Sequence, residues 1–366
     1  MICTGAKKYI VAVICCCLIL IACSNPVQPV TKEEAIAFAK EIENSIKQGN
    51  GDLLDNAFDK KEFVKKMDLP NTEEGNGFAK GIISKPIALG SQLVAALSDQ
   101  DNFQFIKYYE KAGRGHIVFR LYTNKDGSLN YHDYELVKTG GKCRLADAYI
   151  YVSGENLSET MMNIFNSLYG KVSGGKNISE DDKLADLNEL KKVKELMQRG
   201  QNREAKEKYD KLPAYIKASK SVMLINVLIC EDLSTDEYSA ALAEFREKYP
   251  NEPNMSLLMI DGYFMQKDYV KMLAAVNALD SQINKDPLLD YHRYLSYDLL
   301  EDKEKSMACL KRLVTNMPDF QKGYIEYIVQ DLKSGNKQQA DSLIAIYRKK
   351  PKFKQEELDT VVKYYE

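Results

Sequence analysis

The spacing of apolar and polar residues changes part-way along the N-terminal half of the chain. From about residue 31 to residue 97, apolar side chains recur at helical spacing, and from Phe103 onward the period is two. We therefore predict helices first, the earliest beginning at the capping box Thr31-x-x-Glu34. Short helices are expected within 52–67, then a polar turn at 70–77 and a helix near 82–97.

Four strands are expected where the period is two, at about 103–110, 115–123, 128–138 and 142–152. Helices followed by an antiparallel meander predict an α+β domain over residues 31–155. This order of elements resembles the nuclear-transport-factor-two-like and cystatin-like folds, in which a curved sheet wraps a helix. The resemblance implies a similar curved sheet here.

The turns between these strands predict a register. Asp126-Gly127 is typical of a two-residue hairpin loop, and the numbers of opposite residues then add up to 253. Ile117 would face Leu136, and Arg120 would meet Asp133 on the other side of the sheet. If Gly140-Gly141 is also a two-residue turn, the numbers of opposite residues in the next hairpin add up to 281.

The second register brings four polar side chains to one face of the sheet. Tyr134 would face Asp147, and His132 would face Tyr149. Such a group could bind a small ligand or carry out acid–base chemistry. The alternative is that His132 and Asp147 are satisfied polar residues at the rim, with the tyrosines packing around them. His116 is expected about 17 Å from His132 along the ladder, so the two cannot share a metal, and no metal or cofactor is predicted.

One short pattern recurs five times in the C-terminal half: a turn residue, four mostly polar residues and a small residue. The two clearest copies begin at Gly200 and Gly335. The five copies end, in chain order, at Ala205, Ala241, Met272, Ser306 and Ala340. The steps between these ends are 36, 31, 34 and 34 residues, which is the length of a helix–turn–helix repeat.

These repeats resemble tetratricopeptide repeats in the turn, in the small residue of the second helix and in a proline that ends each unit. The prolines stand at positions 213, 250, 287, 318 and 351. The chain departs from that family because it contains no Trp and has Met272 at a small-residue position. The resemblance implies an all-α solenoid of about five helix pairs over residues 181–366, with a capping helix at 355–365.

Residues 1–22 have the features of a secretory signal peptide: two lysines and then an apolar run from Ile10 to Ile21. The run ends in Leu20-Ile21-Ala22-Cys23, which resembles the processing box of bacterial lipoproteins. That resemblance implies cleavage between Ala22 and Cys23 and acyl chains such as palmitate on Cys23, which anchor the protein to a membrane. It also implies a place in the bacterial cell envelope, at the outer membrane. Residues 23–30 would be a tether.

A linking helix and a Gly/Ser-rich loop are expected over residues 156–180, between the two domains. Gly170 to Asn177 nearly spells a phosphate-binding P-loop. A helix rather than a strand precedes it, however, and Asn177 stands where a hydroxyl is needed for Mg²⁺, so we interpret it as a linker.

Composition narrows the range of functions. Lys+Arg 51 against Asp+Glu 53 leaves no domain-wide basic surface, which argues against a nucleic-acid partner. Of the 8 cysteines, only Cys143, Cys230 and Cys309 lie in the body of the chain, in a pattern typical of small buried hydrophobic residues. We therefore expect a lipid-anchored, non-enzymatic scaffold that binds a protein partner through its repeats. The alternative is a ligand-binding or acid–base site in the α+β domain.

Overall fold

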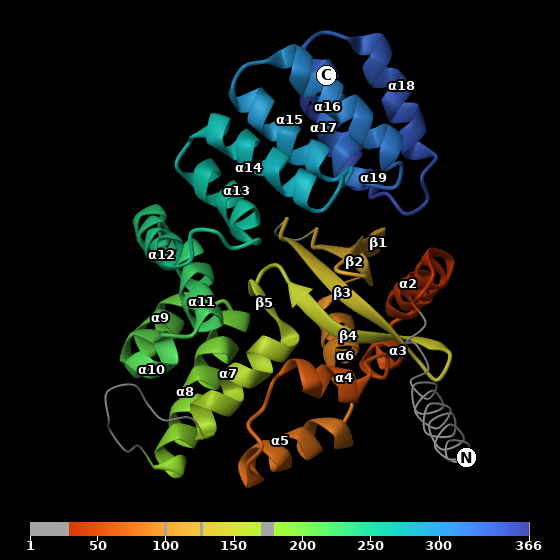
Figure 1. The fold of residues 1–366 in the computed structure, drawn as a ribbon. Helices are drawn as coiled ribbons and strands as arrows, with labels where there is room; N and C mark the ends of the chain where they lie inside the picture. Colours follow the sequence, from red (N-terminus) through yellow and green to blue (C-terminus); the bar gives the residue numbers. More distant parts are fainter. Residues whose placement is uncertain (1–28, 99–100, 125–126, 170–178, 366) are drawn as a thin grey trace, which may run out of the picture.

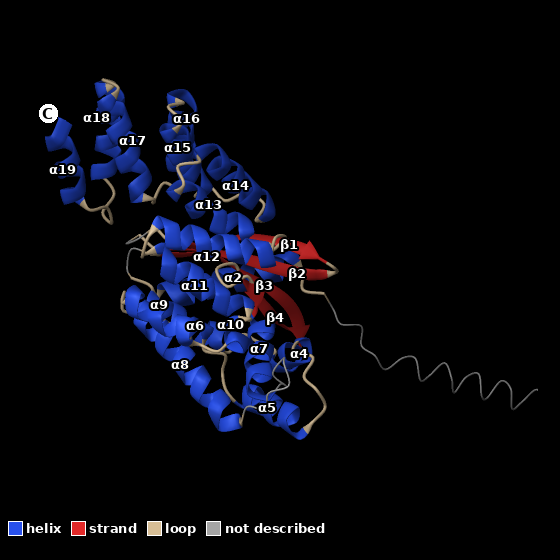
Figure 2. Ribbon diagram, turned by 90° about the vertical axis from the view of Figure 1, so that its left-hand side faces the viewer, coloured by secondary structure: helices blue, strands red, loops and turns tan. Residues whose placement is uncertain are grey.

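The computed structural model describes residues 29–98, 101–124, 127–169 and 179–365. Along the chain, a group of short helices is followed by a sheet and then by a long series of helices (Figures 1 and 2). The helical series passes along one side of the sheet and over one of its ends (Figure 1).

The N-terminal helices are α2 (Lys32–Lys47), α3 (Asp52–Asp55), α4 (Lys60–Lys66), α5 (Glu73–Ser84) and α6 (Leu89–Ala96). The capping box at Thr31 is confirmed, since both of its hydrogen bonds are present. The predicted helix near 82–97 is present only from Leu89 to Ala96, as α6, and its predicted start is wrong. The Thr72 hydroxyl accepts from the N–H of Gly75, so α5 starts inside the expected polar turn. Pro86, which has no N–H, then separates α5 from α6.

The sheet has five antiparallel strands in the order β1-β2-β3-β4-β5. They are β1 (Asn102–Lys111), β2 (Arg114–Tyr122), β3 (Leu129–Thr139), β4 (Lys142–Ile150) and β5 (Glu155–Asn156). The four predicted strands are present. The fifth was not predicted, because a strand of two residues has no periodicity to detect.

The predicted register of the first hairpin is wrong by two residues. Ile117 pairs with Tyr134, and Arg120 lies opposite Tyr131 rather than Asp133. The loop is longer than two residues, because the Thr123 N–H donates to the Ser128 carbonyl at 3.0 Å. A shift of two residues leaves every side chain on its expected face.

The register of the second hairpin is as predicted near its turn and then shifts by one residue. Leu136 pairs with Leu145 as expected, but a β-bulge follows, and Glu135 pairs with Asp147. The bulge lies at Ala146, which has no partner in the ladder. A one-residue shift moves every later side chain of β4 to the opposite face from the one predicted.

One face of the sheet forms a core with the N-terminal helices. Ile117, Phe119 and Tyr134 are fully buried there against Ala39 and Ile42 of α2. The side chains alternate along the strands, so the intervening residues point to the other face.

The C-terminal helices form five pairs joined by short turns, a helical series consistent with the expected solenoid. Helix α7 (Leu157–Tyr169) leads into the series, and the short α10 (Ala214–Lys217) and the terminal α19 (Gln355–Tyr365) stand outside the pairs. The pairs are α8 (Glu180–Gln198) with α9 (Asn202–Lys211), α11 (Lys220–Glu231) with α12 (Thr235–Lys248), α13 (Met255–Met265) with α14 (Tyr269–Gln282), α15 (Leu289–Leu299) with α16 (Lys303–Asn316), and α17 (Gln321–Lys333) with α18 (Lys337–Arg348).

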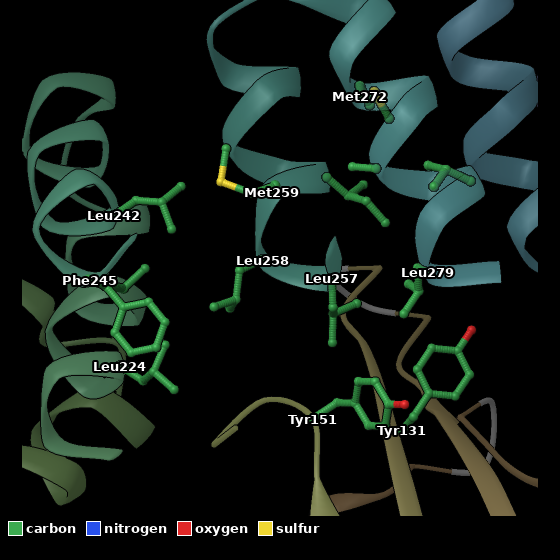
Figure 3. Close-up of a cluster of buried hydrophobic side chains, with 14 of the residues drawn as sticks. Tyr131, Tyr151, Leu224, Leu242, Phe245, Leu257, Leu258, Met259, Met272 and Leu279 are labelled. Carbon is green, nitrogen blue, oxygen red and sulfur yellow. The ribbon is translucent and has the colours of Figure 1, made fainter. Parts of the chain in front are cut away.

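The second face of the sheet packs against these helices. Tyr131 and Tyr151 share a hydrophobic cluster with Leu257 at the start of α13 and Leu279 near the end of α14 (Figure 3). Farther along, Tyr122 contacts Phe320 with ring centroids 5.5 Å apart. The sheet therefore covers the edge of the helical array that contains the loops between successive helix pairs.

Candidate protein-interaction surface

The repeat pattern marks one structural position in four of the five units. This position is the fourth residue of the second helix, and it is buried in each case, at Ala205, Met272, Ser306 and Ala340. The residue five places earlier has a left-handed backbone: Gly200, Lys267, Glu301 and Gly335 have φ values of 73°, 58°, 61° and 74°. The turn position is therefore defined by a left-handed backbone, and glycine is the residue that adopts this conformation with the least strain.

The second unit was predicted in the wrong phase. Ala241 is the seventh residue of α12, and the equivalent fourth residue is Tyr238, which is 2% exposed and 34 residues before Met272. α13 carries Gly262 on the side that faces α12, where the closest side chain is Leu242. A Cβ added at Gly262 would lie 2.6 Å from Leu242 Cδ2 and 3.8 Å from the Tyr238 ring.

The four sheet residues singled out from the sequence do not come together. His132 and Tyr134 point into the N-terminal core, where the His132 Nδ1 lies 3.1 Å from the Tyr134 hydroxyl. The amide of Asn130 donates to His132 Nε2 at 3.3 Å, which places the ring proton on Nδ1. Burial lowers the pKa of His132 to about 4, so the ring is neutral and sealed from solvent.

Asp147 and Tyr149 lie on the opposite face of the sheet from His132 and Tyr134, because the bulge shifts them by one residue. Asp147 accepts hydrogen bonds from the Ser158 N–H at 3.1 Å and from the Ser158 hydroxyl, and so caps the start of α7. Burial raises the pKa of its carboxyl group, although these hydrogen bonds oppose the shift. Tyr149 packs against the cluster that the sheet shares with the repeats. Asp147 and Tyr149 therefore serve the packing of helices against the sheet.

A different polar group occupies the face that points toward the repeats. The Asp133 carboxylate accepts from the Tyr109 hydroxyl and lies 3.0 Å from His116 Nδ1. The Tyr109 and His116 rings stack with centroids 4.8 Å apart, and Lys107 lies 4.6 Å from the Tyr109 ring. The predicted register placed Asp133 opposite Arg120, so this group was missed. No cluster of His, Cys, Asp and Glu able to hold a metal is found among the residues that the structure describes.

Arg120 instead joins the sheet to the repeats. Its guanidinium donates to Asp286, in the loop between α14 and α15, and both side chains are almost completely buried. Tyr131 also donates to Asp286, at 2.7 Å, and Gln104 accepts from Arg120 at 2.6 Å. A second connection lies farther down the array, where Ser221 N–H donates to Glu155 of β5 at 3.2 Å.

The opposite edge of the array, where the turns within pairs lie, is not covered by the sheet. Leu257 at the start of α13 packs on the sheet, whereas Phe264 lies seven residues later, about 10 Å along the helix. Of the ten exposed large hydrophobic residues in the described chain, four flank two neighbouring turns of this edge. They are Phe264, Val270, Leu299 and Leu300, with exposed fractions of 45%, 65%, 40% and 39%.

Comparison with known proteins leaves the family open. No family model matches the chain, and no curated protein matches it significantly. A solved structure named "MamA RS-1 ArsTM double mutant" is similar to 44% of this chain and 91% of its own length, at 15% identity and a TM-score of 0.38.

Several residues predicted from the sequence lie outside the described part of the chain, including Ala22, Cys23 and the P-loop-like segment 170–177. Lipidation therefore remains a prediction. Within the described ranges, no helix is both long and apolar enough to cross a bilayer. Cys230 and Cys309 are buried, as expected, and Cys143 is half-buried, with a thiol pKa that burial raises to about 12.

Proposed function

We propose that this protein is a non-enzymatic scaffold of the bacterial envelope, lipid-anchored at Cys23 and located at the outer membrane, which binds a protein partner through its helical array. The observation that carries the proposal is the exposed apolar edge at the turns within pairs. Apolar side chains gathered on a folded surface favour association with another protein. The other edge of the array is already occupied by the sheet, so the partner binds at the turns around Phe264 and Leu300.

The acid–base alternative is not proposed. It required His132, Tyr134, Asp147 and Tyr149 to share a face, and the bulge in β4 separates the first two from the last two. His132 and Tyr134 are also closed off within the core.

Affinity capture from detergent-solubilised envelopes tests the proposal. The wild-type protein is compared with a Phe264→Ser/Leu300→Ser variant and with Leu184→Ser, which alters a similarly exposed residue (53%) on α8. We expect the wild type and Leu184→Ser to capture the same partner, and the double variant to lose it. An unchanged profile for the double variant, or no partner for the wild type, contradicts the proposal. Independently, Cys23→Ala should abolish acylation and release the protein from the membrane fraction.

A further inference from the structure

The two ends of the sheet differ in their surroundings. In an antiparallel meander, the β1–β2 and β3–β4 turns lie at one end, and the β2–β3 turn lies at the other. Tyr122 and Leu129, which flank the β2–β3 turn, pack against the helical array. The two remaining turns lie away from that contact and form what we call the tether end, residues 110–115 and 137–143.

The described chain enters the fold at this tether end. Pro29 and Val30 line a shallow groove of about 260 Å³ together with residues 112–115 and 136–138. Val30 is buried in the N-terminal core, so the entry point is held firmly against the sheet. Only five residues, 24–28, lie between Cys23 and Pro29, which makes six residue-to-residue steps. At about 3.5 Å per residue they reach at most about 20 Å.

The tether end is also the basic end of the sheet. Its two segments carry four cationic residues (Lys111, Arg114, Lys138 and Lys142) and one acidic residue, Glu110. The opposite end differs: residues 123–128 carry one charge of each sign, and residues 150–156 carry a single glutamate. Glu34, Glu62 and Glu135, which belong to neighbouring elements, neutralise two of these cations, so the positive charge available at this end comes from the other two.

The four cations have different roles. Arg114 pairs with Glu135 at 3.2 Å and with Glu62 at 3.4 Å, and Lys138 pairs with Glu34 at 2.7 Å. Lys111 is the last residue of β1 and Lys142 the first of β4; both are exposed and make no ion pair within the described residues. These two ammonium groups are thus available to an external anion.

We propose that the tether end rests on anionic phospholipid headgroups, with Lys111 and Lys142 as the contacting side chains. This inference depends on the proposed anchoring at Cys23, because the short tether holds these turns within reach of the membrane surface. β3 spans eleven residues, or about 36 Å, so the β2–β3 end of the sheet, where Tyr122 contacts Phe320, lies roughly that far from the tether end. The exposed turns of the array are then presented to partners away from the membrane.

Vesicle co-sedimentation tests the inference without the acyl anchor. The chain from residue 23 onward, carrying Cys23→Ser, retains every described element and is mixed with vesicles of phosphatidylcholine with or without 30% phosphatidylglycerol. We expect binding to the anionic vesicles only. Each lysine near an anionic surface contributes about fivefold to partitioning, so Lys111→Glu/Lys142→Glu should lower it at least about 25-fold.

Lys349→Glu/Lys352→Glu is the matched control, since it makes the same charge change on two exposed lysines of the C-terminal lysine-rich segment. It should leave partitioning unchanged. Equal binding to neutral vesicles, no binding to anionic vesicles, or a loss caused by the control rather than by the turn variant would overturn the inference. The assay contains no protein partner, so its failure is distinguishable from failure of partner capture.

Discussion

Replacing Arg120 by methionine tests whether the sheet and the helical array form one cooperative unit. Arg120 is 1% exposed, and its partner Asp286 belongs to a loop 166 residues later in the chain. Methionine fills much of the same volume but cannot neutralise the carboxylate. Asp286 would keep the Tyr131 hydroxyl at 2.7 Å and the Leu288 N–H at 3.0 Å, yet its charge would be buried without a cation.

The expected cost is about 3–5 kcal/mol, the usual result of removing one member of a buried ion pair. A second variant, Arg120→Met/Asp286→Asn, also removes the carboxylate charge, while the asparagine oxygen can still accept from Leu288 N–H. It should recover at least about 2 kcal/mol of that loss, since most of the penalty comes from the uncompensated charge.

Urea unfolding followed by far-UV circular dichroism measures these differences, because the chain contains no Trp to report fluorescence. The control is Arg203→Met, which breaks an exposed ion pair with Glu237 and should cause no measurable shift. If Arg120→Met behaves like that control, or if the double variant is less stable than the single one, the contact between Arg120 and Asp286 does not join the two parts as described.

Two further predictions concern the turns and the buried histidine. Gly335 and Glu301 occupy equivalent left-handed turn positions, and an added Cβ at Gly335 would meet nothing within 4 Å. Gly335→Ala should therefore lower the free energy of unfolding by about 1 kcal/mol, through backbone strain alone. Glu301→Gly should raise it by less than about 1 kcal/mol. A change of the same sign in both variants would contradict the equivalence of the two turn positions. His132 has a folded-state pKa of about 4, below the ordinary value of 6.5. Between these two pH values the unfolded chain therefore binds more protons than the folded chain. The free energy of unfolding must then fall as the pH drops from 6.5 toward 4. His132→Gln should reduce the slope of unfolding free energy against pH in this window by about 1.4 kcal/mol per pH unit, and an unchanged slope would show that His132 is not buried in its neutral form.

Much of the secondary structure could be predicted because the local periods are clear. The period-two stretches correspond to β1–β4, and the left-handed turns at Gly200 and Gly335 mark two helix pairs directly. The phase of the second unit could not be predicted, because the pattern was defined by a small residue. The residue at that position is Tyr238, which is large and almost completely buried.

The candidate site was harder to predict because it depends on registers and on distant partners. The unpaired residue Ala146 has no distinctive neighbours in the sequence, yet the bulge there separates His132 from Asp147. Arg120 had a plausible local partner in Asp133, and only the fold shows that its carboxylate comes from Asp286. The exposed apolar edge was also missed, since Phe264 has the same helical spacing as its buried neighbours.

The two connections between sheet and array constrain how this protein can change its length in evolution. Ser221 of α11 is held at β5 and Asp286 is held at β2, and the helices between them span the distance from one strand to the other. Inserting or deleting a repeat within that interval would displace one connection by a whole unit. The helix pairs after Asp286, beginning with α15 and α16, face no such restriction from these two contacts. Variation in repeat number among relatives should therefore be concentrated toward the C-terminal end.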